Sequence, residues 1–326
     1  MNNNSNNPLV SIRCMTFNHK PYIRQCLDGF VMQETNFPFV AIVVDDASTD
    51  NEQEVLWDFI NNELNANSLQ KDETEDFVKV VAPHKTNTNC TFVFYLLKYN
   101  HYNIKKTKKP YLEWEDKTEY IALCEGDDYW TEPLKLQKQV DFMESHPDYS
   151  LIYSNYLEDI NGELLKGSWN LLEGDCLKPY LLRKGFFPVP TTMFRKEDYN
   201  SLEAYPHNRF LMGDVPLWIR LMRKGKVKKI SEITAVYRIL PESMSHSQNI
   251  VKRLRFLRSA IDVRLYFAEK YEYNDIAETL KKQLNNVDCK LAIFEKRYLD
   301  YVKLKPWKNN LGLRKTLSII KQSYKS

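Results

Sequence analysis

The sequence lacks any apolar run long enough to cross a bilayer. A membrane-spanning helix needs about 20 predominantly apolar residues, and every apolar stretch in these 326 residues is interrupted well before that length. The N-terminus, residues 1–7, is polar and has neither the cationic nor the apolar region of a signal peptide. We therefore expect a cytoplasmic protein with a disordered tail at residues 1–7 and no membrane-spanning segment.

Closely spaced cysteines and nucleic-acid motifs are also absent. The six cysteines show no close pair in the sequence and no zinc-site spacing. Several fall within apolar runs, which is typical of reduced, buried thiols. No recognised nucleic-acid motif is present, so we expect no nucleic-acid partner. The hydrophobic fraction of 43% and the charged fraction of 27% are ordinary for a globular protein.

The small net charge of +3 hides an asymmetry along the chain. Residues 250–326 carry 18 Lys and Arg against 8 Asp and Glu, whereas the rest carries 28 against 35. This shift predicts a basic helical extension at residues 249–326. Its apolar residues recur at helical spacing, so it either packs on the rest of the chain or makes peripheral contact with an anionic membrane.

A turn with three carboxylates follows the apolar run of residues 120–124. The run is too short for a helix and rich in β-compatible side chains, so it predicts a buried strand. Glu125, Asp127 and Asp128 come directly after it and before a helical pattern. In an open α/β sheet, ligands bind at this carboxyl edge. Clustered carboxylates repel one another unless a cation holds them, and oxygen ligands suit Mg²⁺ or Mn²⁺.

Another acidic turn, at residues 45–50 upstream, makes a merely solvated acidic loop the weaker interpretation. Residues 39–44 form an apolar run without a polar face, which is typical of a parallel strand covered on both sides. Asp45 and Asp46 follow it. Thr49 and Glu52 have the spacing of a capping box, which predicts the start of a helix. Asp45 and Asp46 lie before that cap, and we expect them to face a cleft.

In these two acidic turns, the chain resembles family 2 glycosyltransferases of the GT-A fold, of the kind that builds bacterial surface polysaccharides. The resemblance covers about residues 8–246. It rests on residues 8–18, 45–50 and 125–130, which follow one another in the family's order. One departure is Glu125, which stands where the family usually has Asp.

The resemblance implies a role for each of these turns. The first acidic turn, at residues 45–50, would bind the nucleotide's base and ribose. The second acidic turn, at residues 125–130, is a DxD-type motif and would hold Mg²⁺ or Mn²⁺ against the diphosphate. The implied nucleotide-binding residues are Thr16, Phe17, Asn18, Asp45, Asp46, Glu125 and Asp127. The implied metal ligands are Asp127, Asp128 and His246, although a lone histidine is more often structural. The residues implied to contact the donor sugar or the acceptor are Thr191, Thr192 and Trp130.

Asp214 is the candidate catalytic base. Taken alone, an Asp two residues before a proline is best read as the N-cap of a helix. The family, however, places its base in an Asp at the start of a helix reading Glu-Asp-x-x-Leu-Trp. Here Gly213 replaces the Glu, while Leu217 and Trp218 remain. The resemblance implies that Asp214 removes the proton from an acceptor hydroxyl, and capping does not exclude this role.

Strand-like and helix-like segments alternate over the first half of the chain, which predicts βαβ units. We expect an α/β fold of the GT-A type, with a doubly wound, mostly parallel sheet flanked by helices and a C-terminal helical extension. Residues 91–99 fit a helix or a strand, and Asn161–Gly162 predicts a hairpin. The expected catalytic domain is residues 8–248, with a nucleotide-binding half at 8–147 and an acceptor half at 148–248.

The resemblance implies an inverting, metal-dependent glycosyltransferase. It would move a sugar from a nucleotide-diphosphate donor, first of all a UDP-sugar, to a glycan or lipid-linked acceptor in surface polysaccharide biosynthesis. One alternative is a sugar-nucleotide pyrophosphorylase, which should carry a Gly-rich, basic loop after the first strand. Residues 16–20 contain no glycine. The other is a non-catalytic sugar-nucleotide-binding scaffold, which would be expected to lose the carboxylates that this chain keeps.

Overall fold

The computed structural model describes residues 7–107, 109–167, 172–182, 187–241, 247–295 and 297. The chain divides into two compact units. The second unit joins residues 203–223, which the sequence placed in the acceptor half, to the C-terminal helices. The domain boundary at residue 248 stays a prediction. The first unit comprises Met1–Asp175, Phe187–Leu202 and Lys224–Arg238, and the second Cys176–Phe186, Glu203–Arg223 and Ile239–Ser326.

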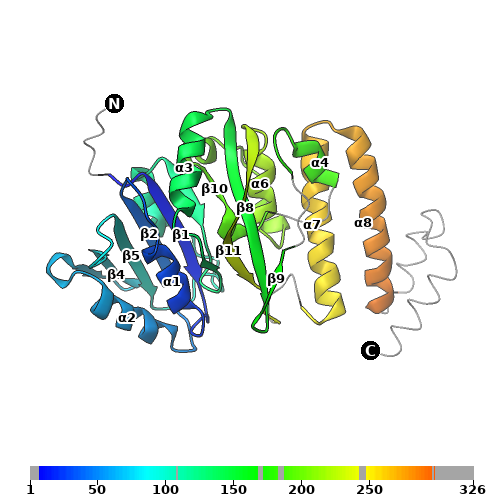
Figure 1. Cartoon of the computed structure of the whole chain (residues 1–326). Helices are drawn as coiled ribbons and strands as arrows, with labels where there is room; N and C mark the ends of the chain where they lie inside the picture. Colours follow the sequence, from blue (N-terminus) through cyan, green and yellow to red (C-terminus); the bar gives the residue numbers. More distant parts are fainter. Residues whose placement is uncertain are drawn as a thin grey trace. The chain divides into compact units, whose positions relative to one another are not determined.

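The first unit is built on an 11-stranded sheet (Figure 1) in the order β3-β4-β5-β2-β1-β6-β10-β8-β11-β7, with β9 paired to β8. Its central strands β5, β2, β1 and β6 are parallel, as expected. The strand bounds are β1 Val10–Thr16, β2 Phe39–Asp45, β3 Gln70–Glu73, β4 Phe77–Pro83, β5 Cys90–Leu97, β6 Tyr120–Leu123, β7 Tyr129–Trp130, β8 Tyr149–Ile160, β9 Glu163–Lys166, β10 Met193–Arg195 and β11 Lys226–Arg238.

Helices flank this sheet, and further helices form the second unit. In the first unit they are α1 Ile23–Val31, α2 Glu52–Glu63, α3 Lys135–Ser145 and α5 Lys196–Asn200, with short 3₁₀ turns η1 Ala66–Ser68, η2 Lys109–Lys117 and η3 Val189–Thr191. In the second unit they are α4 Leu177–Leu182, η4 His207–Arg209, α6 Asp214–Leu221, α7 Ile250–Lys270 and α8 Asn274–Phe294.

Both faces of β2 are buried, which explains its uninterrupted apolar run. Successive side chains of a strand point to opposite faces of the sheet. Phe39, Ala41 and Val43 belong to the core that also contains residues of α1, α2 and α3. Val40, Ile42 and Val44 belong to a second core, against Tyr111 of η2. The central strands are thus covered on both sides, as the sequence predicted.

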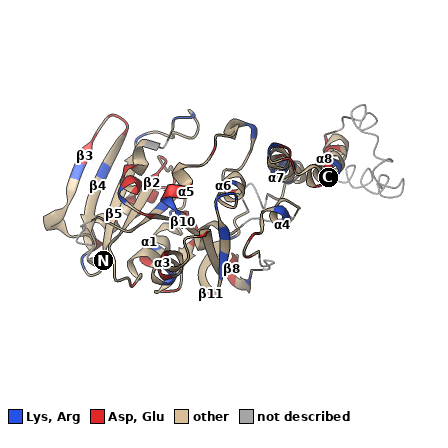
Figure 2. Cartoon of the chain, turned by 90° about the horizontal axis from the view of Figure 1, so that it is seen from above, with Lys and Arg blue, Asp and Glu red and all other residues tan. Residues whose placement is uncertain are grey.

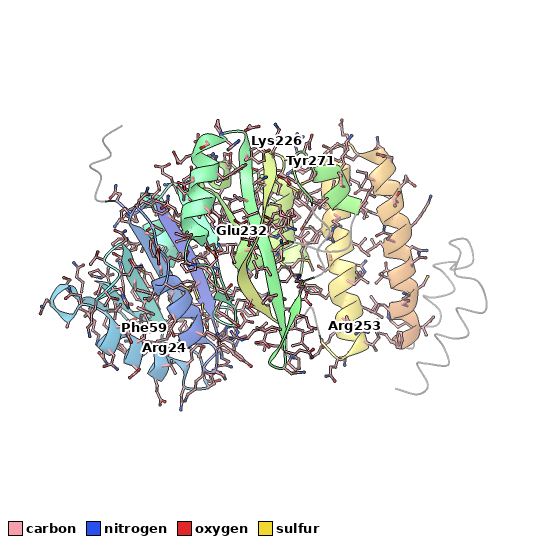
Figure 3. The ribbon with its side chains drawn as sticks, viewed as in Figure 1. Arg24, Phe59, Lys226, Glu232, Arg253 and Tyr271 are labelled. Carbon is pink, nitrogen blue, oxygen red and sulfur yellow. The ribbon has the colours of Figure 1, made fainter. Side chains whose placement is uncertain are left out.

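The contact between α1 and α2 is partly polar. The Arg24 guanidinium lies 5.3 Å from the centre of the Phe59 ring, and the two side chains lie together in Figure 3. Arg24 also donates a hydrogen bond of 2.8 Å to Glu63. Cation–π contacts of this kind contribute about 0.5–1 kcal/mol at exposed sites. They add modestly to the apolar packing of Phe59 and the helices.

Two local sequence signals have clear outcomes. Residues 91–99, which fitted a helix or a strand, lie largely in β5. The hairpin predicted at Asn161–Gly162 joins β8 to β9, and both residues have positive φ, 56° and 89°. Two consecutive left-handed residues are the requirement of a type I′ turn, which explains the choice of Asn-Gly.

Strand β3 lies at one edge of the sheet. All four residues of β3 are exposed. Figure 2 shows blue and red residues on the β3 and β4 ribbons. Charged side chains on an edge strand discourage pairing with another chain. The charged side chains of β3 therefore protect this edge of the sheet from pairing with another chain.

In the second unit, α7 and α8 pack side by side (Figure 1). Arg255 pairs with Glu295 at 2.7 Å and Arg258 with Asp288 at 2.6 Å, which links the two helices. The side chain of Asn249 caps α7 by accepting two backbone N–H bonds. These contacts lie within the extension, and α7 and α8 also contact α4 and α6 of the same unit, which the sequence placed in the acceptor half. Among the described helices, none is both long and apolar enough to span a membrane.

Lys135, at the start of α3, gives a pH-dependent term in stability. Its side chain is fully buried, 2.8 Å from Gln139 Oε1 and 4.1 Å from the centre of the Trp130 ring. Burial lowers its pKa to about 7. Between pH 7 and about 10.4, the unfolded chain therefore binds more protons at this position than the folded protein. Stability then rises with pH across this window, by up to about 1.4 kcal/mol per pH unit.

We expect Lys135→Met to remove this rise. The measurement is urea unfolding of wild type and variant from pH 7 to 9, and the quantity compared is the difference between their unfolding free energies. Lys138→Met, at a partly exposed lysine of the same helix, is the matched control and should leave the profile unchanged. Parallel profiles for Lys135→Met and wild type would show that the buried amine does not titrate in this range.

Candidate active site

Strand order reverses at β1, where the next strand along the chain, β2, lies on one side and β6 on the other. Ligands bind at such a reversal point, outside the carboxyl ends of the strands. Here those ends carry Thr16, Asp45 and the turn after Leu123. Backbone hydrogen bonds join them, from Gly126 N to Met15 O at 3.1 Å and from Asp46 N to Thr16 O at 3.0 Å. Both acidic turns therefore lie at one edge of the sheet.

Asp45 is fully buried and organises the first acidic turn. Its carboxylate accepts hydrogen bonds from the backbone N–H and hydroxyl of Ser48 and from the amide of Gln53. Burial raises the pKa of Asp45, and these hydrogen bonds oppose that rise. The side chain holds the turn together, so the expectation that it faces an open cleft is not met.

Asp46 is also buried, at 2% exposure. Its two carboxylate oxygens accept from the backbone N–H groups of His101 at 2.8 Å and Tyr102 at 3.2 Å. Asn100 donates to the Asp46 carbonyl at 3.0 Å. The Asp46 carboxylate is thus bound by the segment after β5 and holds that segment against the first acidic turn. It is not directed into a cleft.

Glu52 corrects the predicted capping box. The N-cap of α2 is Asn51, in a left-handed conformation and without a side-chain cap bond. Glu52 is fully buried and accepts from the Thr16 hydroxyl and from His19 N at 2.7 Å. Its Oε2 also lies 2.9 Å from the Ser48 hydroxyl, whose single proton is directed to Asp45. Burial raises the pKa of Glu52. The capping-box prediction is wrong because the turn after β1 recruits this carboxylate.

Asn18 also ties the turn after β1 to the first acidic turn. Its φ of 59° is left-handed, a conformation that Asn tolerates better than most residues. Its backbone N–H donates to the Ser48 hydroxyl at 2.9 Å, and its side chain accepts from Thr49 N at 2.7 Å. Phe17, beside it, is 40% exposed and leaves an aromatic ring at the rim.

The second acidic turn packs against Thr16 and His19 with no space to spare. A methyl group on Gly126 would lie 2.2 Å from Thr16 Oγ1 and 3.1 Å from His19 Nδ1. His19 Nε2 lies 3.9 Å from Asp127 Oδ2. The absence of a side chain at Gly126 therefore sets the distance between the two turns.

Asp127 and Asp128 present two unsatisfied oxygens. Asp128 is 1% exposed; its Oδ1 accepts from Arg238 N at 2.8 Å, while its Oδ2 has no hydrogen-bond partner in the described part of the chain. The buried Oδ1 of Asp127 likewise lacks one there. Burial, with the nearby Asp127 charge second, raises the pKa of Asp128 well above its usual range. Unpaired buried carboxylate oxygens are costly, and a cation offsets that cost.

These oxygens fit a divalent cation that binds together with a diphosphate. Mg²⁺ is typically held by one or two carboxylates plus phosphate oxygens rather than by a cage of protein ligands alone. No three His, Cys, Asp or Glu side chains within the described ranges are grouped to hold a metal. Glu125, the first residue of the motif, is exposed at the rim of the turn.

Arg238, at the end of β11, was not singled out from the sequence. It is 7% exposed, its guanidinium donates to the Asp127 carbonyl and to Gln25, and its backbone N–H donates to Asp128. It lies over the rings of Tyr22 at 4.7 Å and Tyr129 at 4.5 Å. Its position after a strand-like run was visible in the sequence, but its contact with a turn 110 residues away was not.

Trp130, Thr191 and Thr192 are buried, which does not favour direct contact with a sugar. Trp130 is 2% exposed and donates from its indole to Pro190 O at 2.7 Å. The hydroxyl of Thr191 donates to Pro188 O at 2.7 Å and that of Thr192 to Val189 O at 2.8 Å. The Trp130 bond joins the second acidic turn to η3, the two threonine bonds are local to η3 and its ends, and the three residues thus have a structural role.

Asp214 belongs to the second unit and is the first residue of α6, whose N-cap is Gly213. Burial raises the pKa of Asp214, and backbone N–H groups at the helix start and the positive charge of Arg264 act against that rise. Arg264 is itself buried, with its guanidinium 5.5 Å from the centre of the Tyr180 ring. A carboxylate with a raised pKa is a stronger base. His246, the other predicted residue beyond the first unit, lies outside the described residues.

We expect Gly126→Ala to disable the site more than it destabilises the fold. The added methyl must displace Thr16, which costs about 1–3 kcal/mol in a packed environment. The displacement moves Asp127 and Asp128 relative to β1, so UDP affinity measured with Mn²⁺ should fall at least tenfold. Gly213→Ala, at a glycine with negative φ and open space around it, is the control for loss of glycine itself. Unchanged UDP affinity in Gly126→Ala would show that the spacing of the turns does not matter.

Comparison with known sequences identifies related proteins. Residues 11–79 match the sequence profile described as Glycosyl transferase family 2. The uncharacterized protein Rv1520 of Mycobacterium tuberculosis is 30% identical over 245 residues, 73% of this chain and 61% of that protein, so the chain spans less than two thirds of this relative. TuaG of Bacillus subtilis, by its name a candidate teichuronic acid biosynthesis glycosyltransferase, is 25% identical over 266 residues, 80% of this chain and 90% of that protein.

Solved structures with the same fold include ligand complexes. Residues 1–349 of S. aureus TarS, in complex with UDP, superpose with a TM-score of 0.54 at 15% identity, covering 98% of this chain and 90% of that one. The mannosyltransferase PcManGT of Pyrobaculum calidifontis, in complex with GDP-Man and Mn²⁺, gives 0.50 at 14% identity, covering 79% and 64%. At these identities the likeness shows the fold alone.

Proposed function

Because the chain belongs to glycosyl transferase family 2, we propose that it transfers a sugar from a nucleotide-diphosphate donor, first of all a UDP-sugar, to a hydroxyl of a glycan or lipid-linked acceptor in surface polysaccharide synthesis. The observation that carries the proposal is one oxygen each on Asp127 and Asp128, at the reversal point of the sheet, that has no hydrogen-bond partner among the described residues. The name of TuaG and the UDP bound to TarS support the polysaccharide context and the nucleotide.

Asp127 and Asp128 are the residues that would hold Mg²⁺ or Mn²⁺. When bound, the ion supplies charge neutralisation for the departing diphosphate. The protein's own contribution is to hold the turn that carries the two carboxylates. Arg238 does so by fixing the Asp127 carbonyl and Asp128 Oδ1, and Gly126 does so by letting the turn approach β1 closely.

The donor nucleotide would bind along the first acidic turn. Phe17 offers an exposed ring face for the base. The side chains of Asn18, Asp45 and Asp46 hold the turns that would form the walls of the nucleotide site. These residues would therefore contact the nucleotide through backbone groups. Thr16, at 3% exposure, supports the floor of that site.

For transfer with inversion, the acceptor oxygen attacks the anomeric carbon while the bond to the diphosphate oxygen breaks on the opposite side. The proton of the acceptor hydroxyl must leave in the same step. We assign this proton to the Asp214 carboxylate. Burial raises the pKa of Asp214 and so increases its basicity. Its helix position is compatible with this role because α6 is capped by Gly213 instead.

The test is a panel of nucleotide sugars incubated with the full-length protein and Mn²⁺, followed by release of the nucleoside diphosphate. The proposal predicts hydrolysis of one or a few donors, stimulated by the right acceptor and abolished by EDTA. Formation of nucleoside triphosphate from pyrophosphate and a sugar nucleotide would instead show the pyrophosphorylase. Tight binding of a sugar nucleotide with no turnover under any condition would show the non-catalytic scaffold.

The C-terminal extension gives a separate prediction. Because α7 and α8 pack with α4 and α6 in the second unit, a chain ending at Gln248 should aggregate through the apolar surface that it exposes. Gel filtration checks this, with full-length protein as control. If the extension instead serves anionic membranes, the truncated chain should stay monomeric while the full-length protein binds anionic vesicles in a salt-sensitive manner.

A further inference from the structure

The geometry points to His19 as a nitrogen ligand of the divalent cation that binds with the nucleotide diphosphate. This inference rests on the proposed function and adds a residue from the turn between β1 and α1 to the metal site. His19 was not among the site residues that the resemblance implied. The residues around it orient its imidazole ring and determine which ring nitrogen has a free lone pair.

His19 and Asp127 lie close enough to share an ion after a small movement. His19 Nε2 lies 3.9 Å from Asp127 Oδ2. Two neighbouring ligands about 2.1 Å from one octahedral ion lie about 3 Å apart, so the two atoms approach by about 1 Å when the ion binds. Both side chains are about one fifth exposed, 20% for His19 and 19% for Asp127. An ion arriving with a diphosphate therefore has access to both groups.

A hydrogen-bond chain selects which imidazole nitrogen is free. The Thr16 hydroxyl donates its single proton to the buried Glu52 carboxylate. Its oxygen, 3.2 Å from His19 Nδ1, is then left to accept, so Nδ1 carries the hydrogen. In the neutral ring the lone pair consequently sits on Nε2, the atom beside Asp127. A carboxylate or hydroxyl behind one nitrogen, orienting the other, is the usual second shell of a metal-bound histidine.

The ring is held in place from two further sides. Glu52 also accepts the backbone N–H of His19 at 2.7 Å, which fixes the base of the side chain. On the other side, the Cβ position of Gly126 lies only 3.1 Å from His19 Nδ1, so the imidazole rests directly on the second acidic turn. The buried Glu52, which caps no helix, thus holds His19 in position.

An imidazole ligand narrows the choice of metal. Carboxylate, phosphate and water oxygens suit Mg²⁺ and Mn²⁺ alike, whereas a nitrogen ligand favours transition metals over Mg²⁺. The site should therefore bind Mn²⁺ more tightly than Mg²⁺ in the presence of UDP. Removal of the imidazole should reduce that preference, because the remaining ligands are oxygens.

The experiment is pulsed EPR of Mn²⁺ bound to the full-length protein with UDP, which reports nitrogen nuclei coordinated to the ion. We expect a ¹⁴N coupling in wild type and none in His19→Gln. The affinity of His19→Gln for Mn²⁺ in the presence of UDP should fall at least tenfold, and that for Mg²⁺ much less. His207→Gln, at an exposed histidine of the second unit, should match wild type. Thr16→Val, which removes the orienting hydroxyl, should weaken Mn²⁺ binding about tenfold.

Two results overturn the inference while leaving the proposed function intact. One is bound Mn²⁺ and UDP without ¹⁴N coupling in wild type, and the other is a coupling that persists in His19→Gln. Failure of wild type to bind Mn²⁺ with UDP at all overturns both the metal site and the histidine. If His19→Gln does not fold, the spectra of wild type and Thr16→Val decide on their own.

Discussion

Replacing Asp128 with Asn should abolish metal-dependent donor binding and, at the same time, make the ligand-free protein more stable. Asp128 is buried, and its Oδ2 has no partner in the described ranges, so its negative charge is unfavourable without a cation. Asn keeps the acceptor for Arg238 N and removes the charge. We expect turnover to fall at least about 10²- to 10³-fold and unfolding to cost about 1 kcal/mol more.

The direction of the pH dependence follows from the raised pKa of Asp128. The folded protein holds a proton at this carboxylate to higher pH than the unfolded chain, whose Asp pKa is about 3.9. The contribution of Asp128 therefore reduces stability progressively as pH rises from about 4 through the folded pKa. Asp128→Asn should lack this loss, and its advantage over wild type should be absent below pH 4.

Thermal unfolding with and without Mn²⁺ and UDP measures both parts of this prediction. Wild type should gain stability from Mn²⁺ with UDP, and Asp128→Asn should not. Asp141→Asn, at an exposed carboxylate of α3, is the control and should behave as wild type. A variant that is less stable than wild type yet keeps its metal-dependent stabilisation would make Asp128 a structural residue only.

Replacing Asp214 with Asn should remove turnover and leave the fold and donor binding intact. Asn keeps the shape and much of the hydrogen bonding at the start of α6, so the loss of stability should be about 1 kcal/mol or less. It cannot accept the acceptor's proton, so turnover should fall at least about 10²-fold. UDP affinity should stay within about twofold, because the residues assigned to the diphosphate are Asp127 and Asp128.

Steady-state transfer kinetics, calorimetry and thermal unfolding separate the possible outcomes. Asp275→Asn, at the exposed first turn of α8, controls for loss of a carboxylate at a helix start in the same unit. Lost turnover with an intact fold supports the base, and a lost fold supports a structural role alone. Full turnover in a folded Asp214→Asn would show that another residue takes the proton. Because the pKa of Asp214 is raised, wild-type turnover should also fall with decreasing pH, and this fall should occur at a pH above the usual range of Asp pKa values.

The central strands and acidic turns were predictable from sequence because their signals are local. The run from Phe39 to Val44 has no polar face, and only burial on both sides explains that. Residues 91–99 were undecided, because a short apolar run fits a buried helix and a buried strand equally well. The spacing of Thr49 and Glu52 pointed to a capping box, but Thr16 and His19, more than 30 residues upstream, compete for that carboxylate.

The site itself was only partly predictable. Asp127 and Asp128 were identified because they follow an apolar strand and because clustered carboxylates repel one another unless a cation binds them. Arg238 carries no such local signal, and its contacts with the turn arise only when β11 and the second acidic turn meet at the sheet edge. Burial of Trp130, Thr191 and Thr192 is likewise a property of tertiary packing, which a family pattern alone does not reveal.

The most direct test of the account is calorimetric titration of UDP into the full-length protein, once with Mn²⁺ and once with EDTA. If Asp127 and Asp128 hold a cation against the diphosphate, UDP should bind at least tenfold more tightly with Mn²⁺, because the ion links two groups that otherwise repel each other. Equal affinity under the two conditions would contradict the assignment of the second acidic turn as the metal-diphosphate site, and with it the proposed mechanism.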